Sequence, residues 1–197
     1  MTRILGPNHG VWRKPDNRPM PCITRARAPA LAVLLFSSLL AACSPTFNWR
    51  DVQVEPTHLK ALLPCKPEKA SREVTMVERK VALEVLGCEA GGATFALLHA
   101  DIGDASRAGD ALRQWRIATL ANLRGTSARD TAFTPPGATA LLQSAQVVAS
   151  GQRADGSKVQ SHAAYFARGS QVFQAVIYTD ELRMDMTDPF FSSLKFQ

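Results

Sequence analysis

Residues 81–102 read VALEVLGCEAGGATFALLHADI. Apolar and polar side chains alternate on both sides of Gly91-Gly92, which is typical of β-strands. Two adjacent glycines permit the positive φ angles of a two-residue turn, so the stretch predicts a tight antiparallel hairpin. Such a hairpin pairs residues across its two strands: Cys88 with Phe95, Leu86 with Leu97, and Glu84 with His99.

The chain before the hairpin predicts two further strands, at residues 49–54 and 73–77, with a charged turn at Arg79-Lys80. Trp49 is either the first anchor of the core or an aromatic residue at a lipid surface. After the hairpin, Asp104 can cap a helix over residues 105–124 that ends at Gly125. An apolar stripe along this helix, one face of which is expected to pack on a sheet, consists of Ala108, Leu112, Trp115, Thr119 and Leu123.

The second half of the chain predicts a three-stranded meander at residues 145–152, 158–168 and 171–179. Pro135-Pro136-Gly137 marks the preceding residues, 131–140, as an irregular loop. The last two strands of the meander carry apolar side chains on both faces, so we expect helices to cover both sides of the sheet. Residues 188–196 predict a short helix and a final extended piece.

This order of elements predicts a single globular α+β domain over residues 49–197, with an antiparallel sheet and helices on both faces. With the opening LPCKP at 63–67 and the ending FFSSLKF at 190–196, it resembles the PsbP-like α/β/α sandwich. That superfamily includes photosystem extrinsic proteins, a Ran-binding import factor and bacterial envelope lipoproteins. The resemblance implies a binding or assembly module, although fold analogy alone does not transfer a function. No site residue of the family matches this sequence well enough to carry over.

The N-terminal part reads as an export signal. Arg25 and Arg27 precede an apolar block at residues 30–40, which at about 11 residues is far short of the ~20 that span a bilayer. A permanent transmembrane helix is the weaker interpretation. Residues 1–19 are polar and rich in Pro and Asn, so translation is expected to begin at Met20. The alternative is a start at Met1 with a disordered n-region extension, which would be removed with the leader.

The run LAAC at residues 40–43 resembles the lipobox of bacterial lipoproteins. The resemblance implies removal of a leader, residues 1–42, and acylation of Cys43 on its sulfur and its new amino group, with residues 43–48 as the lipidated tether. Several acyl chains make such an anchor effectively permanent. Ser44, rather than Asp, favours export to the outer membrane, where the domain would face the periplasm.

The net charge of the whole chain, +6, points at first to nucleic acid or a membrane surface. Residues 1–42 hold six of the 23 basic and one of the 17 acidic residues, so the remainder carries 17 basic and 16 acidic residues, a net charge of +1. No nucleic-acid partner is therefore expected. Cys65 and Cys88 are expected to form a disulfide in an oxidising periplasm. The alternatives are two buried thiols or half of a metal site, although the chain has no Cys-x-x-Cys motif.

The candidates for catalysis are sparse. Glu84 with His99, and Ser161 with His162, are the pairs from which a hydrolase could start, but no Gly-x-Ser-x-Gly motif is present and Ser161 and His162 point to opposite faces of one strand. We therefore predict no catalytic, metal or cofactor site, and we interpret Glu84 and His99 as a surface ion pair.

Two functions remain. The first is a non-catalytic interaction or assembly module for an envelope protein partner. The second is a carrier of a small ligand, with an apolar groove between the long helix and the sheet near Trp115, Tyr165 and Tyr178. A concave apolar pocket of several hundred Å³ favours the carrier, whereas a flat surface with a modest apolar patch favours the module.

Overall fold

The computed structural model describes residues 46–125 and 127–197, which belong to one compact unit. The smaller of its two antiparallel sheets has the strand order β1-β2-β10 and consists of β1 (Arg50–Val54), β2 (Leu59–Leu63) and β10 (Lys195–Phe196). The larger has the order β3-β4-β5-β9-β8-β7-β6 and consists of β3 (Glu68–Met76), β4 (Arg79–Ala90), β5 (Ala93–Asp101), β6 (Ser127–Ala132), β7 (Ala145–Gln152), β8 (Lys158–Arg168) and β9 (Gln171–Thr179). The helices are the short 3₁₀ turn η2 (Ala105–Arg107), α2 (Ala108–Asn122) and α3 (Met184–Ser192).

The predicted hairpin is confirmed as β4 and β5. Ala90 pairs with Ala93 across a two-residue turn in which Gly91 and Gly92 have φ angles of 59° and 74°. The expected pairs of Cys88 with Phe95, Leu86 with Leu97 and Glu84 with His99 are all present. The predicted meander is also confirmed, with β9 pairing with β5 at the centre of the sheet.

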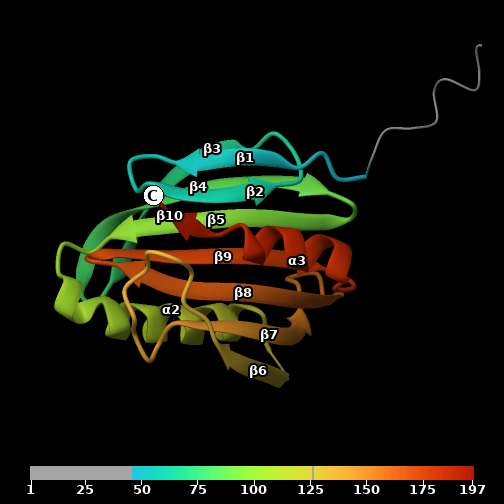
Figure 1. Ribbon diagram of the computed structural model, residues 1–197. Coiled ribbons are helices and arrows are strands. Elements are labelled where there is room, and N and C mark those ends of the chain that lie inside the picture. The colour runs from blue at the N-terminus through green and yellow to red at the C-terminus, as the bar shows by residue number, and fades with distance from the viewer. Residues whose placement is uncertain (1–45, 126) are drawn as a thin grey trace, which may run out of the picture. The chain divides into compact units, whose positions relative to one another are not determined.

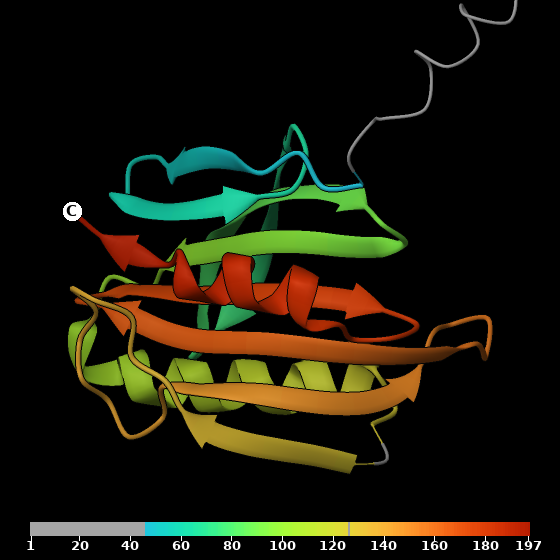
Figure 2. The ribbon, with the colours of Figure 1, turned by 45° about the vertical axis from the view of Figure 1, so that its right-hand side comes forward.

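Each face of the large sheet has its own hydrophobic core. The α2 side buries the side chains Leu83, Ala96, Ala100, Ala163, Tyr165, Val172 and Val176 against Ala108, Ala111 and Leu112 of the helix. The opposite side buries Phe95, Leu97, Phe166, Phe173, Ala175 and Ile177 beneath the small sheet and α3. Figures 1 and 2 show α3 and the small sheet on one side of the large sheet and α2 on the other.

The expected α/β/α sandwich with helices on both faces is wrong. The described chain is mostly β-structure, in sheets of three and seven strands with two α-helices. The apolar residues on both faces of β8 and β9 correctly indicated two covers, but one of these covers is largely a sheet. Leu59, Ala61 and Leu63 alternate along β2 with their side chains buried, so this short strand covers the second face where a helix was expected.

Helix α2 begins and ends close to its predicted positions. The Asp104 carboxylate accepts a hydrogen bond from the backbone N–H of Ser106 and caps η2, which leads directly into the helix. At the other end, the Leu123 carbonyl accepts a hydrogen bond of 2.7 Å from the Gln152 N–H at the end of β7. This close approach requires Gly151, because a Cβ at that position would lie 2.1 Å from the Leu123 carbonyl oxygen.

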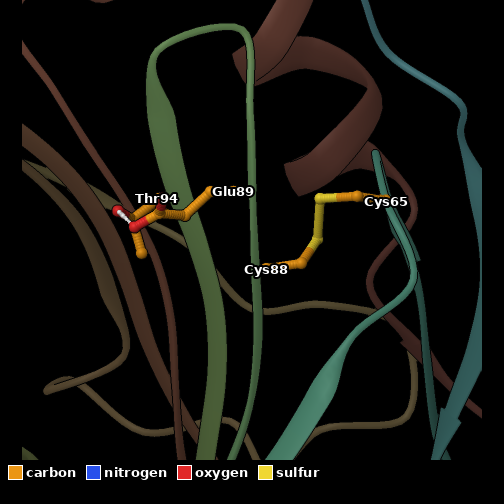
Figure 3. Close-up of a disulfide and its surroundings, with 4 residues drawn as sticks. All are labelled: Cys65, Cys88, Glu89 and Thr94. Atoms are coloured by element: carbon orange, nitrogen blue, oxygen red, sulfur yellow. Dashed lines mark hydrogen bonds between the residues drawn. A yellow bond between two sulfur atoms is a disulfide. The ribbon is translucent and has the colours of Figure 1, made fainter.

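The disulfide between Cys65 and Cys88 is confirmed, with an S–S distance of 2.07 Å. It joins the segment after β2 to β4, on the side of β4 opposite to Glu89 (Figure 3). The two cysteines are 23 residues apart, and closing a loop of that length contributes roughly 3 kcal/mol to stability in the chain-entropy model. The bond therefore ties the small sheet to the large one.

Among the other predictions, one turn is shifted and one strand was missed, and several concern residues that the structure does not describe. The β3–β4 turn is at Val77-Glu78 rather than Arg79-Lys80, and β6 lies partly in the expected loop. Trp49 is half-buried with its ring centroid 6.0 Å from that of Phe95, which makes it a core anchor. The leader (residues 1–42), Met20 and Cys43 lie outside the described residues. Among the described helices, none has the length and apolar character needed to cross a membrane.

Candidate ligand-binding cleft

A cleft of about 810 Å³ lies on the α2 side of the large sheet. Its sheet side comes from β3, β4, β5, β9, β8 and the end of β7 with the turn that follows it, and its helix side from α2 and Leu123. Twelve of the residues that line it are apolar: Val74, Met76, Leu83, Ala96, Leu98, Ala111, Trp115, Ala118, Leu123, Ala154, Val159 and Val176. The other ten are Arg72, Thr75, Thr94, Gln114, Thr119, Asn122, Gln152, Arg153, Gln174 and Tyr178.

The fold forms this cleft by curling one end of the large sheet. Helix α2 packs over β8 and β9, whereas β3 and β4 curl toward the helix from the other side (Figure 2). Arg107 Nη1 donates a hydrogen bond of 2.8 Å to the Val77 carbonyl in the β3–β4 turn. This contact holds the far end of the β3–β4 hairpin at the start of α2, so that the strands and the helix enclose the cleft between them.

Small residues on α2 leave the space open. Ala111 and Ala118 are seven positions apart, which is close to two helical turns, so both lie on the side of α2 that faces the cleft. Trp115 lies between them, is half-buried and supplies the large aromatic surface of the helix wall. The helical spacing that predicts Trp115 as a ligand-binding residue therefore also places Ala111 and Ala118 on the same side of the helix.

The structure separates the three predicted site residues. Trp115 and Tyr178 line the cleft. Tyr165 does not, because its side chain is fully buried in the core between α2 and the sheet, with its ring centroid 6.5 Å from that of Trp115. Its position makes Tyr165 a support for the cleft wall rather than a group that a ligand could touch.

A buried polar network joins the helix to the sheet beneath the cleft. The Gln174 side-chain amide donates hydrogen bonds to Tyr165 Oη at 2.9 Å and to Thr119 Oγ1 at 3.3 Å. Thr119 Oγ1 in turn donates to the Trp115 carbonyl at 3.0 Å. Burial raises the pKa of Tyr165, opposed by its hydrogen bonds to Thr119 and Gln174. Because buried polar groups must be satisfied, these bonds fix the position of α2 over the sheet.

Tyr178 presents a neutral hydroxyl group to the cleft. Burial raises the pKa of its phenol to about 12, with a smaller contribution from nearby Tyr165. At neutral pH the hydroxyl is therefore protonated and can both donate and accept a hydrogen bond. With the hydroxyl of Thr94, its neighbour across β5 and β9, it offers the cleft polar contacts among apolar side chains.

Sequence reasoning missed most of the polar residues of the cleft, among them Arg72, Arg153 and Gln174. A signal for Gln174 was present, because it is the one amide within the apolar run VFQAVIY of β9. A polar group in such a run is buried and must find partners. Arg72 carried no comparable signal, since it lies in the charged sequence of an exposed edge strand.

None of the residues considered for catalysis lines the cleft: Glu84, His99, Ser161 and His162. His99 is buried with its ring centroid 5.9 Å from that of Phe173, and burial lowers its pKa against the opposing charges of Glu84 and Asp101. It is therefore not the exposed partner of a surface ion pair, and the Glu84 carboxylate accepts a hydrogen bond of 2.7 Å from Ser71.

Ser161 and His162 lie on opposite faces of β8, as predicted. Ser161 is buried, whereas the His162 ring packs against Phe191 of α3 in a tilted arrangement, at a centroid distance of 4.1 Å. Burial lowers the pKa of His162, opposed by the charge of Asp188. Within the part of the chain that the structure describes, no three His, Cys, Asp or Glu side chains come together as a metal site would require.

Comparison with known proteins adds no assignment, since no protein-family model and no curated protein matches the chain.

Proposed function

We propose that this protein is an exported, lipid-anchored carrier that binds a small, largely apolar ligand in the cleft between α2 and the large sheet. The observation that carries the proposal is the cleft itself. Its volume of about 810 Å³ falls within the roughly 300–1,000 Å³ of small-molecule sites, and a mostly apolar lining with a few polar groups is typical of such sites.

The chemistry of the lining favours binding over catalysis. Among the described residues that line the cleft, none is a His, Cys, Asp, Glu or Lys, and Tyr178 is the one member of the side-chain types that commonly act as general bases or acids. Within the lining, the Tyr178 hydroxyl has no adjacent base to activate it as a nucleophile. The Thr94 hydroxyl donates a long hydrogen bond of 3.5 Å to the carboxylate of Glu89, which lies outside the lining. These hydroxyl groups serve better as contacts for the polar end of a ligand.

The surface gives less support to an interaction module, the other function expected from the sequence. Large apolar side chains that are exposed include Ile117 on α2, Leu142 before β7, Val148 on β7 and Met184 at the start of α3. They come from four different segments of the chain and do not by themselves define the contiguous apolar patch that is typical of a docking surface. Association with an envelope protein would be a second role on another part of the surface.

Ala118 offers a direct test of the cleft. Its exposed side chain lines the cleft, so Ala118→Phe should fill part of the space without disturbing the core. The compact unit, residues 45–197, is exported without the lipid and titrated with N-phenylnaphthylamine, an uncharged apolar dye that fluoresces when it leaves water. We expect saturable binding to the parent and a loss of about tenfold or more in affinity in Ala118→Phe.

The matched control is Ala121→Phe, an exposed position on the same helix that does not line the cleft. It should bind the dye as the parent does. Equal affinity in both variants, or no saturable binding to the parent, would contradict the carrier proposal.

The lipid anchor and the cellular location form the second part of the proposal. The lipobox-like residues 40–43 support acylation at Cys43, and the disulfide between Cys65 and Cys88 supports folding in an oxidising compartment such as the periplasm. Ser44 favours the outer membrane. Replacing Cys43 with Ser should remove the acyl chains and release the full chain from the membrane fraction. Unchanged membrane association of this variant would refute the anchor.

A further inference from the structure

The charge of the cleft is one-sided. Among the described residues of its lining, Arg72 and Arg153 carry charges and no residue is acidic. Tyr178 adds no negative charge, because burial raises its pKa to about 12. Arg72 comes from β3 and Arg153 from the turn between β7 and β8, so two different strand regions bring positive charge to one apolar space.

The guanidinium group of Arg153 already forms an ion pair and hydrogen bonds within the protein. Its Nη1 lies 2.7 Å from the Asp180 carboxylate and donates hydrogen bonds to the Lys158 carbonyl at 2.7 Å and to Ser157 Oγ at 3.3 Å. These contacts hold the turn in place and compensate most of the charge of Arg153. Its role at the cleft is therefore mainly to fix the local geometry.

Arg72 has no such compensation. Of the ion pairs formed within residues 46–125 and 127–197, none includes Arg72, and its neighbour Glu73 pairs instead with Lys80 at 3.0 Å. Side chains on a strand alternate in direction, so Arg72 shares the cleft-facing side of β3 with Val74 and Met76. Among the residues that the structure describes, the Arg72 guanidinium group thus has no anionic partner, and it lies beside an apolar surface.

We infer that the ligand is an amphiphile with a single carboxylate head, which Arg72 binds while the apolar chain lies along Trp115 and Leu98. This inference rests on the proposed carrier function and adds the chemical class of the ligand. A guanidinium group matches a carboxylate through two parallel hydrogen bonds, and it stays charged at any physiological pH. One uncompensated positive charge fits a singly charged carboxylate better than a doubly charged phosphate.

The test uses residues 45–197 with bound N-phenylnaphthylamine, which is displaced by ligands that share one alkyl chain. Decanoate, decanol, decyltrimethylammonium and decyl phosphate each have one ten-carbon chain, which in decanoate includes the carboxylate carbon, and they differ in the head group. We expect decanoate to displace the dye at a concentration about tenfold or more below that of decanol, because hydrogen bonds to charged groups are the strong ones. Decyltrimethylammonium should be the weakest of the four.

The variant Arg72→Gln should remove the advantage of decanoate over decanol, which is a ratio of two affinities measured on the same variant. Arg129→Gln is the matched control, because Arg129 is also an exposed arginine on an edge strand, β6, but does not line the cleft. It should keep the full preference for decanoate.

The outcomes separate this inference from the proposed function. If the parent fails to bind the dye and all four alkyl compounds, the carrier proposal itself is wrong. If the dye binds but decanoate and decanol compete equally, or Arg72→Gln and Arg129→Gln behave alike, the carboxylate inference is wrong and the carrier proposal stands. Tighter binding of decyl phosphate than of decanoate would overturn the choice of head group.

Discussion

At the scale of single residues, Gly151 shows how one missing side chain positions the wall of the cleft. Its backbone approaches Leu123 so closely that an added Cβ would lie 2.1 Å from the Leu123 carbonyl oxygen. The neighbouring Gln152 N–H donates its hydrogen bond to that same oxygen. A larger residue at position 151 must therefore displace the end of α2 and weaken this bond.

Gly151→Ala is expected to lower the free energy of unfolding by about 1–3 kcal/mol, the usual cost of overpacking. Gly109→Ala is the control, because the nearest atom to its added Cβ is the flexible end of Gln143, at 2.8 Å, and alanine is the better helix former by up to about 1 kcal/mol. Urea denaturation of both variants checks the pair. Equal midpoints for Gly151→Ala and the parent would show that α2 is not held in this way.

The sequence alone predicted only part of the binding cleft. Trp115 and Tyr178 were found because an aromatic residue on a helix stripe or strand face is visible in the pattern. Tyr165 was expected beside them, but its place on the same face of the sheet does not reveal that α2 covers it. Arg72 could not be found, because its role depends on the curl of an edge strand and on the ion pairs that its neighbours form.

At the scale of elements, the sequence pattern predicted correctly those strands and turns that interactions between neighbouring residues determine. The β4–β5 hairpin, its register and the β7–β8–β9 meander follow from alternation and from turn residues, and all are present. The cover of the second face was predicted wrongly as helical. Five residues in β2 give a weak local signal, and β10 has only two residues, so their pairing is specified by the core beneath them and not by sequence pattern.

The edge strand β6 was missed for a related reason. Its sequence, SARDTA, is polar and largely exposed, so it has no buried face to produce an alternating pattern. Its pairing with β7 and the short contact between Arg116 of α2 and Asp130 hold it in place. Elements that are held by partners distant in sequence are those that a single sequence predicts least well.

At the scale of the whole molecule, the two faces of the large sheet have different tasks. One face is closed by the small sheet and α3 and is tied by the disulfide, which gives a rigid frame. The other is covered by α2 over only part of its width, and the strands that the helix leaves uncovered line the cleft. This division favours a stable scaffold that presents one concave binding site.

The most direct test of the carrier function is the mass of the protein as the cell makes it. Residues 45–197, exported to the periplasm and purified without detergent, are analysed by native mass spectrometry beside the Ala118→Phe variant. The parent is expected to carry a retained small molecule, released on denaturation, which the variant lacks. A parent that shows only the mass of the bare polypeptide, or the same bound molecule on both proteins, would contradict a ligand-binding cleft between α2 and the sheet.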